Sequence, residues 1–168
     1  MIKKSLLIPL VGSLLGGISV MIYAINVKIS QKRLTRQHRE TLASFPLFDL
    51  DSSRIYLHPK RATILLYFDS GCDHCQYEIS EIISNRKAFE NTEVVFMSSE
   101  LISTIKSYAA GNCPPDLTNM RFTKINENQA YKTFGSLAVP QIFIYGADGA
   151  LLKEFKGETK VEALIQYL

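Results

Sequence analysis

Hydrophobic and polar positions divide the chain into three parts. From Leu6 to Val27 there are 22 residues without a charge, and most of them are apolar. The next segment is polar and basic, with no clear apolar stripe of helical period. After it, short apolar runs rich in strand formers alternate with segments in which apolar residues recur at helical spacing. The pattern predicts a membrane anchor, a basic stalk and a folded domain, over residues 1–27, 28–44 and 45–168.

The predicted folded domain alternates strands with helices. Ala62–Phe68 is a continuous apolar run, which is typical of a central strand buried on both faces. The other predicted strands are Phe45–Leu50, Arg54–Leu57, Glu93–Ser98, Met120–Ile125, Gln141–Tyr145 and Leu151–Phe155. The predicted helices are one that begins at Cys72 and those over Glu100–Ala110, Asn126–Phe134 and Glu158–Leu168. With a hairpin signal at Asp148-Gly149, this order predicts an α/β fold with a central mixed sheet and helices on both faces.

The N-terminal apolar segment is long enough to cross a membrane. As a helix its 22 residues span roughly 33 Å, and a bilayer core measures about 30 Å. A buried core helix is the alternative, but such a helix rarely lacks any charge over six turns. The segment is too long for a cleaved signal, so we expect an uncleaved anchor. Lys3 and Lys4 favour a cytoplasmic N-terminus, whereas the basic residues of the stalk favour the opposite orientation.

Charge and cysteine content narrow the function further. The net charge is only +3, and five of the nineteen Lys and Arg residues lie between Lys28 and Arg39. The chain has no basic stripe with interleaved aromatic residues, so we expect no nucleic-acid partner. Three cysteines cannot all pair within one molecule, and the domain is long enough to bury a core without disulfides. A close pair and one odd cysteine indicate redox chemistry or metal binding.

The close pair is Cys72 and Cys75, separated by two residues where a strand turns into a helix. At a helix N-terminus, unpaired N–H groups and the positive end of the dipole favour a thiolate at Cys72, and a thiolate is the nucleophile of disulfide exchange. Cys75, one turn later and more buried, would then resolve the mixed disulfide. A protonated His74 would favour the thiolate and Asp73 would oppose it. The alternative is that both are solvated turn residues.

A metal site is the competing use of a cysteine pair. Structural zinc needs four ligands, but His38 and His58 stand alone and no other cysteine or histidine lies close to Cys113 in the sequence. We therefore expect no metal and no cofactor beyond the disulfide itself. We expect Cys113 to pack as a small hydrophobe, with an intermolecular disulfide as the alternative. Val139-Pro140 comes directly before a predicted strand, where proline is tolerated and a cis peptide bond forms readily.

Together these residues resemble the thioredoxin superfamily. Ile64–Phe68 and the helix that begins with Cys72-Asp73-His74-Cys75 are similar to its central strand and active-site helix. Val139-Pro140 is similar to its cis-proline loop, and Asp148-Gly149 to its final hairpin. The anchor and the entry strand resemble the membrane-tethered, extracytoplasmic redoxin branch.

This resemblance implies a thiol–disulfide oxidoreductase that acts on partner proteins carrying cysteines or disulfides, with a thiol electron donor or acceptor. Cys72 would attack, Cys75 would resolve, and Val139 with cis-Pro140 would line the groove for a substrate polypeptide. It also implies a single pass through a bacterial-type cytoplasmic membrane, with the domain on the periplasmic side.

Three features depart from the thioredoxin pattern. Gly71 stands where thioredoxins carry Trp, and Leu66 stands where they carry a buried Asp that assists proton transfer. Between the two cysteines, Asp73-His74 replaces their Gly-Pro dipeptide. These departures favour a specialised partner over general reductase activity. They leave open a non-catalytic module that keeps the fold and works by binding or assembly. A peroxidase-like redoxin is less favoured, because a peroxidatic cysteine usually stands without a partner two residues on.

Overall fold

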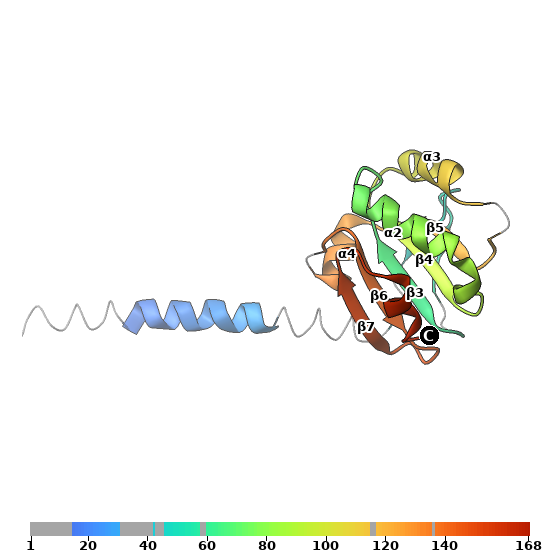
Figure 1. Ribbon diagram of the computed structural model, residues 1–168. Helices are drawn as coiled ribbons and strands as arrows, with labels where there is room; N and C mark the ends of the chain where they lie inside the picture. Colours follow the sequence, from blue (N-terminus) through green and yellow to red (C-terminus); the bar gives the residue numbers. More distant parts are fainter. Residues whose placement is uncertain (1–14, 31–41, 43–45, 58–59, 115–116, 136) are drawn as a thin grey trace, which may run out of the picture.

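A computed structural model describes residues 15–30, 42, 46–57, 60–114, 117–135 and 137–168. The folded part is one mixed sheet with helices on both faces, as the sequence predicts (Figure 1). Its strands, in chain order, are β1 (Leu47–Phe48), β2 (Arg54–Ile55), β3 (Thr63–Tyr67), β4 (Glu93–Ser98), β5 (Met120–Lys124), β6 (Gln141–Tyr145) and β7 (Leu151–Lys156). The helices of the folded part are α2 (Asp73–Ser84), the short 3₁₀ helix η1 (Arg86–Phe89), α3 (Ile102–Asn112), α4 (Glu127–Phe134) and α5 (Val161–Ile165).

The strand order in the sheet is β2-β1-β5-β4-β3-β6-β7. β3 pairs with β4 in parallel and with β6 in antiparallel, so it has a neighbour on both sides. Its sequence is apolar without alternation because both of its faces are covered. The C-terminal ends of the parallel strands β3 and β4 lie side by side at one end of the strands. The N-terminal end of the antiparallel strand β6 lies beside them.

Residues of β3 alternate between two apolar cores, one on each face of the sheet. Ile64 and Leu66 point to a core that is completed by α2, α3 and α5. Leu65 points to the opposite core, which α4 covers. Leu42, which the sequence assigns to the stalk, is buried in this second core, and its N–H donates to Gly149 O at 2.6 Å. The folded part therefore includes a residue that precedes the predicted boundary at residue 45.

Local signals explain the ends of α4. The side chain of Asn126 accepts hydrogen bonds from Asn128 N at 3.0 Å and Gln129 N at 3.4 Å, which satisfies two of the free N–H groups of the first turn. Gly135 follows the helix with a φ of 81°, a conformation that glycine adopts without the steric cost of a side chain. The predicted helix Asn126–Phe134 therefore differs from α4 only at its first residue, which is the N-cap.

Two other helices differ from their predicted bounds. α3 begins at Ile102 rather than Glu100, because Glu100 and the serines before it are engaged with other segments. α5 begins at Val161 rather than Glu158, because Gly157 adopts a φ of 80° and the N–H of Thr159 donates to a side chain of α2.

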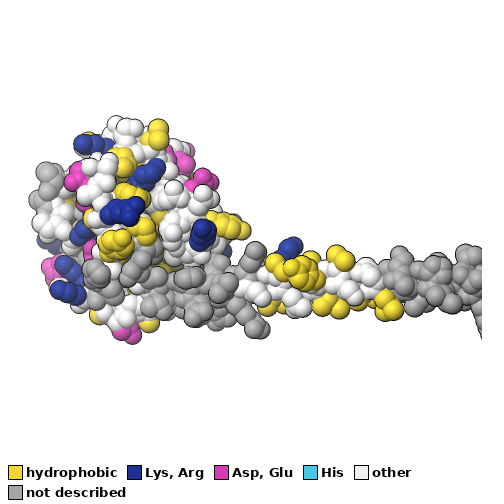
Figure 2. Space-filling model, turned by 180° about the vertical axis from the view of Figure 1, so that it is seen from behind, with side chains coloured by type: hydrophobic (Ala, Val, Ile, Leu, Met, Phe, Trp, Pro, Cys, Tyr) yellow, Lys and Arg dark blue, Asp and Glu magenta, His cyan; other side chains and the backbone are white. Residues whose placement is uncertain are grey.

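The predicted membrane anchor lies only partly within the described residues. Residues 15–30 form a helix on which every side chain is exposed, and apolar side chains lie along it (Figure 2). Residues 1–14 and most of the stalk lie outside the described residues. In the part of the chain that the structure describes, no helix is both long and apolar enough to cross a bilayer.

Candidate active site

The site lies where β3 leads into α2. After the buried Phe68, the segment Asp69–Gly71 crosses the edge of the sheet and brings Cys72 to the N-cap of the helix. Asp69 shapes this turn twice, because its side chain accepts from Gly71 N at 2.8 Å and its carbonyl accepts from Cys72 N at 3.1 Å. The chain therefore enters α2 with Cys72 in an extended conformation (φ −91°, ψ 115°). The N–H groups of the first helical turn follow directly.

The two cysteines are free thiols with different surroundings. Cys72 is half-buried and Cys75, one turn later, is fully buried in the core beneath α2. Burial raises the pKa of Cys75 to about 12, and a hydrogen bond and charge interaction with Cys72 add to the effect. One thiol of the pair is therefore accessible, while the other is held as a protonated group.

The loop before β6 faces Cys72 from the other side of the site. The Val139–Pro140 peptide bond is cis, and the carbonyl oxygen of Val139 lies 3.9 Å from Cys72 Sγ. Val139 is 41% exposed, so this loop offers an accessible edge next to the accessible thiol.

The side chain of Gln141, the first residue of β6, is bonded to that loop. This side chain is fully buried. The side-chain oxygen Oε1 accepts from Ala138 N at 2.8 Å, and the side-chain Nε2 donates to Glu154 on β7 at 2.7 Å. The loop that faces Cys72 is thus supported by a buried polar contact as well as by the sheet.

Asp73 and His74 lie in the first turn of α2, at the surface. His74 Nδ1 lies 2.9 Å from Glu158 Oε2, in the loop between β7 and α5, and the two side chains are 73% and 44% exposed. An exposed pair of this kind contributes about 0–1 kcal/mol to stability. Asp73 is exposed, and an acidic residue suits the positive end of a helix. Of the predicted site residues, the structure brings Cys72, Cys75, Val139 and Pro140 together and directs His74 toward Glu158.

Glu78 is a buried acid that the sequence interpretation missed. It lies one turn after Cys75 on α2, and its side chain is fully buried. Its Oε2 accepts from Thr159 N at 2.6 Å, and its Oε1 has no hydrogen-bond partner among the described residues. Burial raises its pKa to about 7, with Glu158 and Glu81 adding to the rise, although the bond from Thr159 opposes it. The available signal was its position between Cys75 and Ile82 on the apolar face of the helix.

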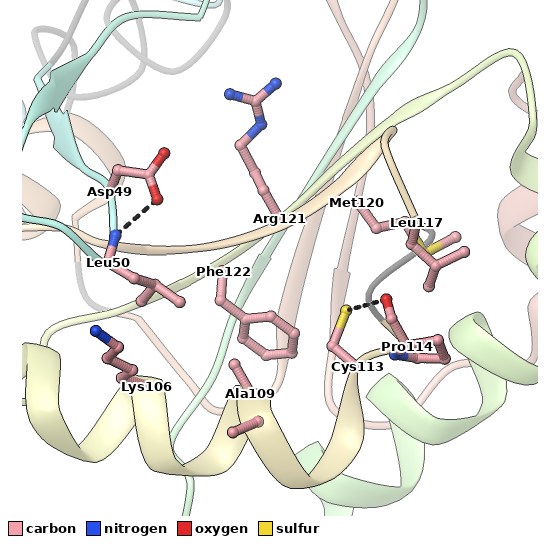
Figure 3. A pocket seen from close by; sticks show the side chains of 11 residues that line it. Asp49, Leu50, Lys106, Ala109, Cys113, Pro114, Leu117, Met120, Arg121 and Phe122 are labelled. Carbon is pink, nitrogen blue, oxygen red and sulfur yellow. Dashed lines mark hydrogen bonds between the residues drawn. The ribbon is translucent and has the colours of Figure 1, made fainter.

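Cys113 lies away from this site, in an apolar pocket of about 350 Å³ between α3 and β5 (Figure 3). Its Sγ is 3.7 Å from Pro114 O, and the ring of Phe122 lies in the middle of the pocket. Cys113 follows the last residue of α3, and Glu100, just before that helix, contacts the loop that precedes Cys72. Cys113 packs against the same core as Cys72 and Cys75, but the residues that line its pocket include neither of them.

Metal binding has no support in the described ranges of the chain. Among those residues no group of three or more His, Cys, Asp or Glu side chains is arranged to hold a metal ion. His38 and His58 lie outside the described residues.

Comparison with known proteins gives likeness in structure rather than in sequence. No family model and no curated protein matches the chain. A peroxiredoxin-like protein from Aquifex aeolicus is similar with a TM-score of 0.64 and 11% identity, over 76% of this chain and 82% of that one. StoA from Bacillus subtilis is similar with a TM-score of 0.60 and 19% identity, over 76% and 98% of the two chains.

A third similar structure is the exposed lipoprotein thioredoxin Etrx1 from Streptococcus pneumoniae. It has a TM-score of 0.58 and 20% identity, over 74% of this chain and 96% of its own. Sequence identities this low establish the fold alone. The chain therefore has the thioredoxin-like fold that its cysteine pair, apolar runs and Val-Pro dipeptide predict.

Proposed function

We propose that this protein is a thiol–disulfide oxidoreductase that acts on partner proteins through Cys72 and Cys75. The observation that carries the proposal is the unequal pair of free thiols at the head of α2, with the accessible one facing the cis-proline loop. An accessible thiol at a helix N-terminus is placed for attack, and a buried thiol one turn later is placed for resolution.

The exchange transfers two electrons and two protons. The thiolate of Cys72 attacks one sulfur of a partner's disulfide, and the partner's other sulfur leaves as a thiolate that takes up a proton. Cys75 then loses its proton and attacks the sulfur of Cys72. The mixed disulfide breaks, the partner leaves as a dithiol, and Cys72 and Cys75 are joined in a disulfide. The same steps in reverse would oxidise a partner dithiol.

Glu78 is the proposed proton acceptor for the resolving step. A thiol with a pKa near 12 rarely ionises at neutral pH, so Cys75 needs a base close by. Residues three apart on a helix are neighbours. Glu78 has a pKa near 7 and an oxygen that no other group in the described part of the chain binds. Glu78 thus takes the role of the buried acid that Leu66 on β3 does not provide.

The loop around Pro140 is the proposed docking edge for the partner. Val139 is exposed beside Cys72, and the buried contact of Gln141 fixes the position of the loop. A partner segment lying along this edge would present its sulfur to Cys72 Sγ.

The test is the redox equilibrium of the full-length protein in detergent, measured in glutathione buffers by counting free thiols. We expect a reversible Cys72–Cys75 couple that a Cys113→Ser variant leaves unchanged. A potential near −270 mV would indicate a reductase, and one near −120 mV a disulfide donor. If no reversible couple forms, the oxidoreductase proposal is wrong.

We further propose that residues 6–27 anchor the protein in a membrane, with the domain on the extracytoplasmic side. Support comes from the uncharged sequence and from the exposed apolar side chains of the helix over residues 15–30. A helix that is apolar all round suits a lipid environment. The similar Etrx1 is described as an exposed lipoprotein, which agrees with a domain outside the cytoplasm.

The anchor is tested by flotation of the full-length protein with lipid vesicles. We expect the wild type to float, and a double variant Ile18→Lys/Ile22→Lys to remain with the soluble fraction, because a charge at the centre of a membrane helix costs about 2.5–3.5 kcal/mol. The control is Leu152→Lys/Ile165→Lys, which changes exposed apolar residues of the folded domain and should float. Flotation of the Ile18→Lys/Ile22→Lys variant would count against the anchor. A reporter fused after Leu168 that is active only in the cytoplasm would count against the orientation.

A further inference from the structure

The carboxylate of Glu100 is bonded to the loop that precedes Cys72. Glu100 lies in the turn between β4 and α3, which is separate in sequence from the cysteine pair. Its Oε2 accepts from the N–H of Ser70 at 2.9 Å, and its Oε1 accepts from the hydroxyl of Ser70 at 2.7 Å. Ser98 at the end of β4 donates a third hydrogen bond, at 3.0 Å. The partly buried carboxylate of Glu100 thus accepts three hydrogen bonds, two from Ser70 and one from Ser98.

Ser70 is held from both sides. Its N–H and hydroxyl bind Glu100, while its carbonyl oxygen accepts from the amide of Gln76 on α2 at 2.9 Å. Ser70 stands two residues before Cys72, in the only covalent connection between β3 and α2. The loop is therefore fixed to the sheet edge on one side and to the active-site helix on the other.

The turn that carries Glu100 is itself fastened. Lys124 on β5 donates to the carbonyl oxygens of Ser99 and Glu100. Ser99 Oγ lies 2.9 Å from the hydroxyl of Tyr67, at the end of β3. Burial opposes a charge on Glu100, but the hydrogen bonds from Ser70 and Ser98 outweigh it and hold its pKa below the ordinary value. At neutral pH the group that binds Ser70 is therefore the charged carboxylate of Glu100, and the turn that carries it is held by Lys124 and Tyr67.

We infer that Glu100 is a positioning residue, which fixes the Asp69–Gly71 loop through Ser70 and thereby raises the stability of the Cys72–Cys75 disulfide. The inference rests on the proposed function, because it concerns the redox equilibrium of that pair. Glu100 acts through Ser70, and no contact between Glu100 and either sulfur is required.

The geometry of the loop gives this effect its sign. Closing a disulfide depends on how often the two sulfurs meet in the correct orientation, and an anchored loop raises that frequency. Breaking the contact between Glu100 and Ser70 lowers the effective concentration of one thiol at the other and disfavours the disulfide. Loss of the contact between Glu100 and Ser70 therefore makes the couple more oxidising.

The experiment is the equilibrium of the full-length protein with glutathione. In each cycle the two thiols of the protein give two electrons and two protons to one oxidised glutathione, which leaves as two molecules of reduced glutathione. We expect Glu100→Gln to lower the equilibrium constant for disulfide formation about tenfold, which is about 30 mV. Ser70→Ala keeps the charge of Glu100 and removes one hydrogen bond, so we expect a smaller fall, about threefold.

A double variant and a matched control separate positioning from general destabilisation. Glu100→Gln/Ser70→Ala should fall little further than Glu100→Gln alone, because both changes break the same contact. Glu93→Gln removes a carboxylate from the opposite end of β4, where Glu93 pairs with Arg121 at 3.1 Å, and it should leave the equilibrium constant unchanged.

Two outcomes would overturn the inference. One is a wild-type equilibrium constant in both Glu100→Gln and Ser70→Ala. The other is an equal shift in Glu93→Gln, which would mean that any loss of stability moves the couple. In both cases the wild type would still form a reversible disulfide, so the proposed function would stand. Absence of that couple in the wild type would reject the proposed function instead.

Discussion

Replacing Cys72 with serine is expected to lower the rate of disulfide exchange by more than about a thousandfold, as the loss of a catalytic nucleophile commonly does. A serine hydroxyl is not a thiolate at neutral pH, and Cys75 is buried, so neither group can attack a partner in its place. The measurement is a single-turnover reaction of the pre-reduced full-length protein with a fluorescent disulfide peptide.

Cys113→Ser is the matched control for this prediction. Cys113 follows the C-terminal end of α3 and lines the pocket of Figure 3 rather than the contact of Cys72 with Val139, so its removal should leave the rate within about twofold of the wild type. Loss of the reaction in Cys113→Ser together with a wild-type rate in Cys72→Ser would move the chemistry to that pocket and contradict the assignment of Cys72.

Replacing Glu78 with glutamine is expected to remove a loss of stability that the wild type shows between pH 5 and pH 8. The pKa of Glu78 is raised from 4.5 to about 7 in the folded protein. Between these two values the folded state binds a proton that the unfolded state has released, so the stability of the wild type falls as the pH rises through this window. At about 1.4 kcal/mol for each unit of pKa difference the full effect is about 3–3.5 kcal/mol, of which about 2–3 kcal/mol is lost between pH 5 and pH 8.

Urea unfolding of the wild type, Glu78→Gln and Glu162→Gln at the two pH values tests this prediction. Glutamine cannot ionise and can still accept from Thr159 N, so the stability of Glu78→Gln relative to the wild type should be greater at pH 8 than at pH 5 by about 2–3 kcal/mol. Glu162 is exposed on α5, and its variant should follow the wild type at both values. Identical pH profiles for Glu78→Gln and the wild type would mean that Glu78 has an ordinary pKa.

The same variant also probes the resolving step. If Glu78 accepts the proton of Cys75, the mixed disulfide formed at Cys72 should persist longer in Glu78→Gln than in the wild type, because Cys75 ionises less readily. A wild-type lifetime would leave Glu78 as a titrating group without a part in exchange.

The buried acid of this protein, Glu78, lies on the helix α2, whereas the central strand β3 carries the apolar Leu66. Leu66 on β3 points into the core beneath α2, where it provides packing only. Glu78 lies on α2, which covers the same face of the sheet, and its Oε2 accepts from the backbone N–H of Thr159 in the loop before α5. The departure at Leu66 is therefore accompanied by an acid that the helical pattern presents as one polar residue among apolar ones.

Much of the fold could be predicted because short-range rules govern it. The unbroken apolar run of β3 predicts a strand covered on both faces, and the helical spacing over Asn126–Phe134 predicts α4 to within one residue. The predicted starts of α3 and α5 are wrong because Glu100 and Thr159 form contacts outside their own helices. Helical propensity cannot detect such contacts, since their partners lie in other elements.

The sequence by itself determined that a cysteine pair stands at a strand–helix junction and that a Val-Pro dipeptide precedes a later strand. Both are local features, since three residues on a helix make less than one turn and proline restricts its own neighbourhood. Only the tertiary structure decided that Val139 faces Cys72, that Glu100 holds Ser70 and that Glu78 is buried against Thr159. These partners are 67, 30 and 81 residues apart. They meet because β3 lies between β4 and β6 and the last helix packs beside α2, an arrangement that is set by packing and strand pairing rather than by any local pattern.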